Sequence, residues 1–277
     1  MSIIAHLSDT HFGTEIPFVV EALRKALQRL QPDVVIVSGD VTQRARKHEF
    51  QSARQFLDTL SAPAVLVIPG NHDIPLFNVF ARTAWPYRNY CEAFGKSHQI
   101  WAGSDMVILA LDSTTPLRHT RGRLDISQLS ALASQIPASD TEPLRIACAH
   151  QPLHTAWPED LHEILIGAGD AAQAFARHRI DIVLSGHVHV PLVTTTHAAF
   201  PAVPRHFILC GAGTAVSHRT RPAAPNSFNV ITSSGNTDPA SVSIAIWRLD
   251  AAVAEFIAEP ESSFFRSANG WHQQSLE

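Results

Sequence analysis

Short apolar runs alternate with longer amphipathic stretches through the first two thirds of the chain. A short apolar run bounded by polar or turn residues is typical of a buried strand, and apolar residues spaced three and four apart are typical of a helix packed on a core. The predicted strands are Ile3–Leu7, Val34–Val37, Ala64–Ile68, Met106–Leu111, Ile146–Ala149 and Ile180–Leu184. The predicted helices are Phe18–Leu30, His48–Leu60, Ile126–Ile136 and Asp170–His178. This alternation favours βαβ units with right-handed crossovers.

After Val190 the pattern changes to consecutive strands separated by Gly, Pro, Asn and Asp turns, which predicts a second, mainly antiparallel sheet packed on the first. These strands are Leu192–His197, Arg205–Leu209, Phe228–Thr232, Val242–Leu249 and Ala252–Ile257. The aromatic-rich segment Pro75–Gly95 predicts helices beside the site, as either a cap or a dimer contact. We expect one domain over residues 1–259, followed by a polar, loosely ordered tail over residues 260–277.

Composition narrows the class of protein without naming a function. The chain has 277 residues and a formal net charge of −4, and no block of Lys or Arg stands out, which argues against a long nucleic-acid partner or a membrane surface. The first residues lack the pattern of a secretory signal, and no apolar run is long enough to span a membrane. The odd number and wide spacing of Cys91, Cys148 and Cys210 favour reduced, buried thiols. We therefore expect a cytoplasmic protein.

Five segments share one design, in which an apolar strand leads into a tight Gly or Ser turn and then into residues that bind metals. They are Leu7–His11, Val37–Asp40, Pro69–Asp73, Cys148–His150 and Leu184–His189. In an α/β sheet, ligand sites gather beyond the carboxyl ends of the strands. The five segments are therefore predicted to converge on one site.

The residue types in these segments indicate a two-metal centre. Carboxylates together with neutral imidazoles suit Mn²⁺, Fe²⁺ or Zn²⁺. One carboxylate can bridge two ions about 3.5–4 Å apart, and Asp40 is the natural candidate for the bridge. Asp-x-His and His-x-His place alternate side chains on one side of an extended segment, where both can reach one ion. The predicted ligands are Asp9, His11, Asp40, Asn71, His150, His187 and His189.

Taken in order, these motifs resemble the calcineurin-like metallophosphoesterase superfamily. The matching motifs are Asp9-x-His11, Gly39-Asp40, Gly70-Asn71-His72-Asp73, His150 and Gly186-His187-x-His189, and the matching blocks extend from residue 4 to about residue 190. A single motif of this kind is common, whereas five in order, each after a strand, are specific. The resemblance implies an α/β fold, a four-layer αββα sandwich in which helices flank two packed mixed β-sheets.

The resemblance also implies a role for each residue of the site. The first ion would be held by Asp9, His11 and His189, and the second by Asn71, His150 and His187, with Asp40 between them. His72 would be a catalytic residue that, with Asn71, faces the substrate. Asp73 would either orient the His72 ring or cap the following helix. A metal-bridging hydroxide would attack phosphorus.

The segments Leu7–Gly13 and Pro69–Asp73 most resemble class III cyclic nucleotide phosphodiesterases and bacterial glycerophosphodiesterases. In several of those enzymes a second His and a Pro follow the metal-binding His, whereas here His150 is followed by Gln151 and Pro152. The resemblance therefore implies a phosphodiesterase for a small diester without singling out a cyclic nucleotide. Alternatives are a phosphomonoesterase or a nucleotide-sugar pyrophosphatase with the same site. A non-catalytic binding module is disfavoured, because no ligand is missing.

Several other polar residues near these motifs have two interpretations. Asp112 follows a predicted strand and favours a turn over a further metal ligand. Arg44 and Arg46 would either meet a substrate phosphate or begin a helix. His154 and His218 would line the cleft or lie on the surface. The Gly211–Thr214 segment lacks the Lys of a phosphate-binding loop, which indicates a turn at the rim of the cleft.

Overall fold

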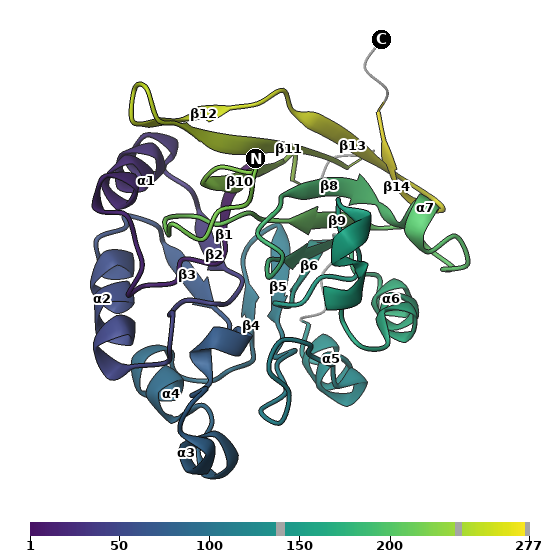
Figure 1. Ribbon diagram of the computed structural model, residues 1–277. Coiled ribbons are helices and arrows are strands. Elements are labelled where there is room, and N and C mark those ends of the chain that lie inside the picture. The colour runs from purple at the N-terminus through teal and green to yellow at the C-terminus, as the bar shows by residue number, and fades with distance from the viewer. Residues whose placement is uncertain (137–141, 236–239, 275–277) are drawn as a thin grey trace.

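The computed structural model describes residues 1–136, 142–235 and 240–274, which form two packed β-sheets (Figure 1). The first sheet has the order β14-β13-β11-β10-β1-β2-β3, and β12 pairs with β11 beside this path. Its strands β1, β2 and β3 are parallel, and its other pairings are antiparallel. The bounds are β1 Ser2–Leu7, β2 Val34–Val37, β3 Ala64–Val67, β10 Ser227–Ser233, β11 Ser241–Asp250, β12 Glu255–Ala258, β13 Ser262–Ser267 and β14 Gly270–Gln273.

The second sheet has the order β4-β5-β6-β7-β9-β8. Its four central strands are parallel, and β4 and β8 run antiparallel at its two edges. The bounds are β4 Gln99–Ala102, β5 Met106–Ala110, β6 Leu144–Cys148, β7 Ile182–Ser185, β8 Leu192–Thr195 and β9 Ile208–Gly211. Both sheets are therefore mixed.

Helices cover the outer faces of both sheets, with α1 and α2 on one side and α5 and α6 on the other (Figure 1). Their bounds are α1 Pro17–Leu30, α2 Lys47–Asp58, α5 Ile126–Ala133 and α6 Ala168–Arg177. One apolar core lies under each helical layer, and a third fills the space between the sheets. The predicted four-layer αββα sandwich is confirmed.

The late strands are distributed differently from the prediction. Instead of making a separate sheet, β8 and β9 complete the sheet that contains β5–β7, and β10–β14 extend the sheet that begins with β1. The strand β4 was not predicted. An alternating pattern reports which face of a strand is buried, but it does not report which edge the strand joins.

The expectation of a loosely ordered tail after Pro260 is wrong. Residues 262–267 and 270–273 form the paired strands β13 and β14, while residues 275–277 lie outside the described part. Phe264 and Trp271 from these strands are fully buried in the core between the sheets. Two large aromatic side chains at the right spacing outweigh the polar composition of the segment.

The segment Pro75–Gly95 contains two helices, α3 Val79–Ala84 and α4 Arg88–Phe94, as expected. Tyr90 fixes α4, because its ring is buried and its hydroxyl donates to the carbonyl of Val67. Phe77 and Phe80, in contrast, are largely exposed. Whether this segment caps the site or forms a dimer contact stays a prediction.

The three cysteines are free, but they are not all buried. Cys148 and Cys210 lie in the core between the sheets, and Cys91 lies exposed on α4. The expectation of three buried thiols is therefore wrong for Cys91. The pattern of the sequence places Cys91 in a helix and leaves open which side of that helix faces the protein.

Candidate metal centre and active site

Every predicted metal ligand lies just beyond the carboxyl end of a strand. Asp9 and His11 follow β1, Asp40 follows β2, Asn71 follows β3, His150 follows β6, and His187 and His189 follow β7. β1–β3 belong to one sheet, and β6 and β7 belong to the other. The site is therefore assembled where the carboxyl ends of parallel strands from both sheets meet.

The backbone at the site adopts a conformation that L-residues rarely take. Asp9, His11, Asp40, His187 and His189 all have positive φ angles, of 51°, 42°, 48°, 76° and 62°. A positive φ costs free energy for residues with a Cβ atom and persists only where the surroundings hold it. The turns thus aim these five side chains into one small volume at the expense of local stability.

Two glycines allow the turns to approach one another closely. A Cβ atom at Gly70 would collide with the backbone and carboxylate of Asp40, and one at Gly186 would collide with Ser8 and Asp9. Each glycine thus lies where the turn after one strand touches the turn after another. A side chain at either position would push the two touching turns apart.

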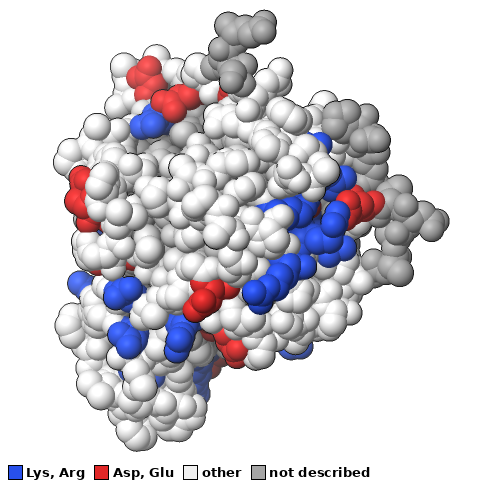
Figure 2. Space-filling view, turned by 90° about the vertical axis from the view of Figure 1, so that its right-hand side faces the viewer, with Lys and Arg blue, Asp and Glu red and all other residues white. Residues whose placement is uncertain are grey.

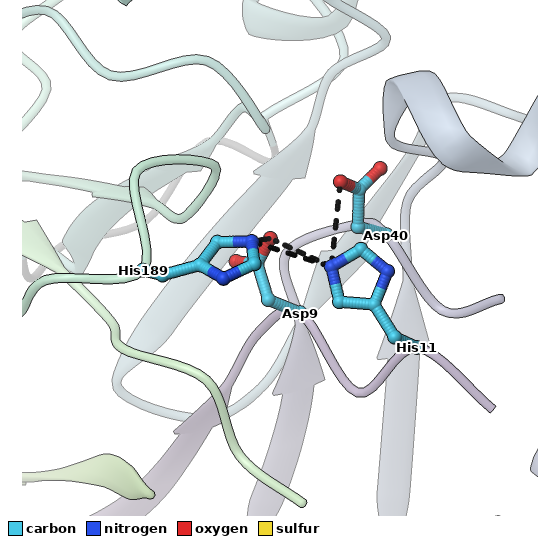
Figure 3. A group of neighbouring side chains, drawn as sticks. All are labelled: Asp9, His11, Asp40 and His189. Carbon is cyan, nitrogen blue, oxygen red and sulfur yellow. Dashed lines mark hydrogen bonds and ion pairs between the residues drawn. The ribbon is translucent and has the colours of Figure 1, made fainter. Parts of the chain in front are cut away.

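Four side chains form the first cluster, which Figure 3 shows with their ends directed toward one another. Asp9 Oδ1 lies 3.1 Å from His189 Nε2 and 3.6 Å from His11 Nε2, and Asp40 Oδ2 lies 3.8 Å from His11 Nε2. The two Nε2 atoms are themselves 3.3 Å apart. The four ligand atoms lie within 4.8 Å of one another, which fits a single ion among them.

Asp40, His150 and His187 form a second cluster, so Asp40 belongs to both. Asp40 Oδ1 lies 3.3 Å from His150 Nε2, whereas its other oxygen faces His11. Asn71 lines the same pocket with Asp40 and His187. The two oxygens of one carboxylate thus face two separate groups of ligands.

Burial and charge together prepare the first cluster for a cation. Burial alone would raise the pKa of Asp9, but the neighbouring His189 and His11 hold that pKa well below its usual range. The same opposition, with His150 as the main partner, keeps the pKa of Asp40 low. Burial lowers the pKa of His11 to about 4, so this imidazole is neutral near pH 7. Ionised carboxylates and a neutral imidazole are the forms that bind a metal. At His189, burial alone would lower the pKa, but Asp9 raises it, so an ion there competes with a proton.

The sequence matches the model of one protein family over most of these elements. Residues 3–191 match the calcineurin-like phosphoesterase family. The chain belongs to this family. Calcineurin-like phosphoesterases use divalent metal ions, and the Asp–His clusters provide a site for them.

Two curated relatives from this comparison carry names for phosphodiesterases. Glycerophosphodiester phosphodiesterase GpdQ of Enterobacter lignolyticus is 32% identical over 168 residues, which cover 54% of this chain and 57% of the relative. A probable cyclic nucleotide phosphodiesterase of Synechococcus is 26% identical over 190 residues, which cover 65% of this chain and 69% of the relative. The chain thus spans little more than half the length of the first relative.

Solved structures show the same fold at low sequence identity. A purple acid phosphatase from yellow lupin (Lupinus luteus) gives a TM-score of 0.65 at 12% identity, with coverage of 96% of this chain and 54% of that one. A dimetal phosphatase from Danio rerio gives a TM-score of 0.60 at 12% identity, with coverage of 88% and 95%. These likenesses support the sandwich architecture.

His72 and Asp73, which follow the family motif, have different surroundings. The His72 ring packs edge-on against His11 at a centroid distance of 4.8 Å and lines the pocket. The His72 Nδ1–H group donates a hydrogen bond to the carbonyl oxygen of Gln43 at 2.9 Å. The expectation that Asp73 orients this ring is therefore wrong.

Asp73 holds the turns after β2 and β3 together. One carboxylate oxygen accepts from the backbone N–H groups of Val41 and Gly70, and the other accepts from the N–H and hydroxyl of Thr42. These donors surround Asp40 in sequence and space. Asp73 therefore supports the site through the backbone.

The pocket beside the clusters has a volume of about 210 Å³ and includes residues that the sequence did not indicate: Thr120, Asp160, Glu163, Arg219 and Arg221. Arg219 Nη1 lies 3.1 Å from His72 Nε2 and 3.2 Å from Gln43 Oε1. Arg221 pairs with Asp160 at 3.1 Å and lies over the Trp157 ring. None of the five follows a strand end, so no periodic signal marked them.

The residues with two interpretations mostly have structural roles. Asp112 accepts from the N–H and hydroxyl of Thr114, as expected of a turn. The backbone N–H groups of Arg44 and Arg46 donate to Glu49 at the start of α2, and the Arg44 guanidinium lies over Phe77.

The loop residues near the rim of the cleft complete this picture. Among the residues described as lining the pocket, neither His154 nor His218 occurs. The turn expected at Gly211–Thr214 is not formed: Gly211 ends β9, and in the irregular segment that follows the Thr214 hydroxyl donates to the Arg219 carbonyl. Buried Gln151 accepts from the Ser113 hydroxyl and donates to the Thr120 carbonyl, so it braces two loops.

Within the described residues, no helix is long and apolar enough to cross a membrane.

Proposed function

We propose that this metallophosphoesterase hydrolyses a small phosphodiester with two divalent ions held on either side of Asp40. The observation that carries the proposal is the position of Asp40, whose two oxygens face different ligand clusters. The names of the two curated relatives, a glycerophosphodiester phosphodiesterase and a probable cyclic nucleotide phosphodiesterase, support a diester substrate.

The donor atoms fit such a pair of ions. Among the described residues, Asp9 Oδ1, Asn71 Oδ1 and His150 Nε2 are buried and have no hydrogen-bond partner. Buried polar atoms of this kind are costly unless a ligand satisfies them. Asp9, His11 and His189 would hold the first ion, and Asn71, His150 and His187 the second. Mn²⁺, Fe²⁺ and Zn²⁺ all suit this mixture of oxygen and nitrogen donors.

Two ions supply an activated water and a counter-charge for the phosphoryl oxygens. The side chains of the pocket have separate tasks around the substrate. His72 projects between His11 and Arg219, and we assign its Nε2 atom to the phosphoryl or leaving oxygen. The Arg219 guanidinium has only neutral partners among the described residues, Gln43 and His72, so it is available to a phosphate oxygen.

The size of the pocket, together with the charge pattern on one face of the molecule, favours a small substrate over a long nucleic acid. The pocket of about 210 Å³ accommodates a phosphate with a short substituent. On the face shown in Figure 2, which is the right-hand side of Figure 1, Lys and Arg form one short band with acidic side chains at its ends and a few separate groups, and much of the surface is uncharged. A continuous basic track, which a long polyanion requires, is absent from that face.

A substrate panel tests the proposal. We expect bis(p-nitrophenyl) phosphate to be hydrolysed with a higher kcat/KM than p-nitrophenyl phosphate in the presence of Mn²⁺. Asn71→Ala, which removes one ligand of the second ion, serves as the inactive control. A clear preference for the monoester would replace the proposed function with a phosphomonoesterase, the second candidate that the same centre permits.

A further inference from the structure

Glu163 contacts a metal-site histidine from outside the two clusters. It is the last residue of η2, a 3-10 helix over Pro158–Glu163 in the loop after β6. Its Oε2 atom lies 3.3 Å from His187 Nε2. The His187 side chain is only 7% exposed and that of Glu163 is 28% exposed, so water screens this contact less than an ordinary surface pair.

The other imidazoles of the site show what such an outer contact does. His150 Nδ1 donates to the carbonyl of Ser38 at 2.7 Å, and His189 Nδ1 donates to the carbonyl of Arg219 at 2.5 Å. In both residues the remaining nitrogen, Nε2, faces a carboxylate of the cluster. An oxygen acceptor on one nitrogen thus fixes the ring and turns the other nitrogen toward the ion.

His187 uses this arrangement in reverse. Glu163 contacts its Nε2 atom, so Nδ1 is the nitrogen that would remain for an ion at the cluster of Asp40 and His150. The backbone of His187 is fixed separately, because its N–H donates to Asp9 Oδ2 at 2.9 Å. Rotation of the ring about its last torsion, which is intrinsically soft, is what Glu163 restrains.

We propose that Glu163 is a positioning residue that sets the affinity of the second metal ion through His187. Among the described imidazoles of the site, His187 is distinguished by a charged side chain as its outer partner, whereas His150 and His189 use backbone carbonyls. An ionised carboxylate also makes the imidazole a stronger donor to a metal. The inference rests on the proposed two-metal function and adds a specific residue to it.

Calorimetric titration of the metal-free protein with Mn²⁺ measures the effect directly. We expect the wild-type protein to bind two ions, and Glu163→Ala to weaken one of them roughly 10- to 100-fold. Glu163→Gln keeps an acceptor oxygen for the ring N–H and is expected to restore part of this loss. Glu159→Gln is the matched control, because it removes the same charge from an exposed position of the same helix.

Two backgrounds identify which ion is affected. With Asp9→Asn, which disables the first site, Glu163→Ala should still weaken the remaining ion. With Asn71→Ala, which disables the second site, Glu163→Ala should change nothing. Thermal unfolding of the metal-free variants, monitored by circular dichroism, checks that Glu163→Ala folds as the wild-type protein does, and Glu163→Gln provides the comparison if it does not.

The outcomes separate the two proposals. If the wild-type protein binds two ions and Glu163→Ala weakens neither, the role of Glu163 is overturned and the proposed function stands. The same holds if Glu159→Gln weakens metal binding as much as Glu163→Ala does. An effect confined to the ion that Asp9→Asn removes would overturn it as well. A wild-type protein that binds no divalent ion would overturn the proposed function itself.

Discussion

Trp271, near the end of the described chain, donates its indole N–H to Asp181 Oδ1 at 2.7 Å. Trp271 lies on β14 in the first sheet, and Asp181 directly precedes β7 in the second, so this bond joins the two sheets. Arg205 and the backbone N–H of Arg145 also donate to the Asp181 carboxylate. The C-terminal strands are thus part of the sandwich that carries the metal centre.

Replacement of Trp271 should destabilise the whole domain. We expect Trp271→Ala to lower the free energy of unfolding by about 3–5 kcal/mol, because it leaves a large cavity. Trp271→Phe should cost less, about 1–2 kcal/mol, because most of the packing remains and one buried hydrogen bond is lost. Urea unfolding measures both. Phe265→Ala on β13 is the control, since Phe265 is 40% exposed, and an equal loss there would contradict the role assigned to Trp271.

Asp73→Asn should lower the free energy of unfolding, because Asp73 supports the turns of the site and does not contact the substrate. The amide can accept at one position only, so its NH₂ group would face two of the donors that now bind the carboxylate. We expect a loss of roughly 3 kcal/mol in the free energy of unfolding from these unsatisfied groups. Asp125→Asn is the comparison, because Asp125 is exposed and accepts from the N–H and hydroxyl of Ser127 at the start of α5, where water can replace it, and it should cost less. Full stability with lost turnover would instead restore a catalytic role for Asp73.

The positions of the candidate metal ligands were predictable because each follows an apolar strand in a short, recognisable motif. Asp9, Asp40 and His187 needed only the rule that strand ends converge. Glu163 and Arg219 were not predictable, because Glu163 ends a short 3-10 helix and Arg219 lies in a loop, neither of which has a periodic pattern, and their contacts depend on how these segments fold back. Trp271 was missed for a related reason, since a short polar segment does not reveal which strand it will pair with.

Arg219→Gln should weaken the hydrolysis of every phosphate ester. The guanidinium has neutral partners in the pocket, so its charge is available to the substrate, and its loss should lower kcat/KM roughly 10- to 100-fold, the equivalent of one charge-assisted hydrogen bond. Arg219→Lys should recover part of the rate. Arg221→Gln is the control, because Asp160 already balances the charge of Arg221. A larger effect at Arg221 than at Arg219 would show that the substrate binds on the other side of the pocket.

Thiol reactivity should distinguish the three cysteines. Burial raises the pKa of all three thiols, that of Cys210 to about 12, but it shields only Cys148 and Cys210 from reagents, because Cys91 lies exposed on α4. A thiol is nucleophilic only as the thiolate, so Ellman's reagent should react with one thiol per native chain and with three in denaturant. Cys91→Ser should abolish the native reaction. Two or more reactive thiols at native stability would contradict the burial of β6 and β9.

Metal binding should stabilise the fold, and Asp40 should be required for most of that effect. Without ions, the site combines close carboxylates, buried unpartnered atoms and five residues at positive φ, so an ion that satisfies these groups favours the folded state. At a free Mn²⁺ concentration 100 times the dissociation constant, we expect a gain of about 2.7 kcal/mol per site in the free energy of unfolding, visible as a rise in Tm. Chelation should reverse this rise and abolish turnover.

Asp9→Asn should remove part of the rise in Tm, because the second cluster remains intact. Asp40→Asn should remove nearly all of it, since both clusters lose the shared carboxylate. Equal effects of the two substitutions on Tm would mean that Asp40 serves one ion rather than two.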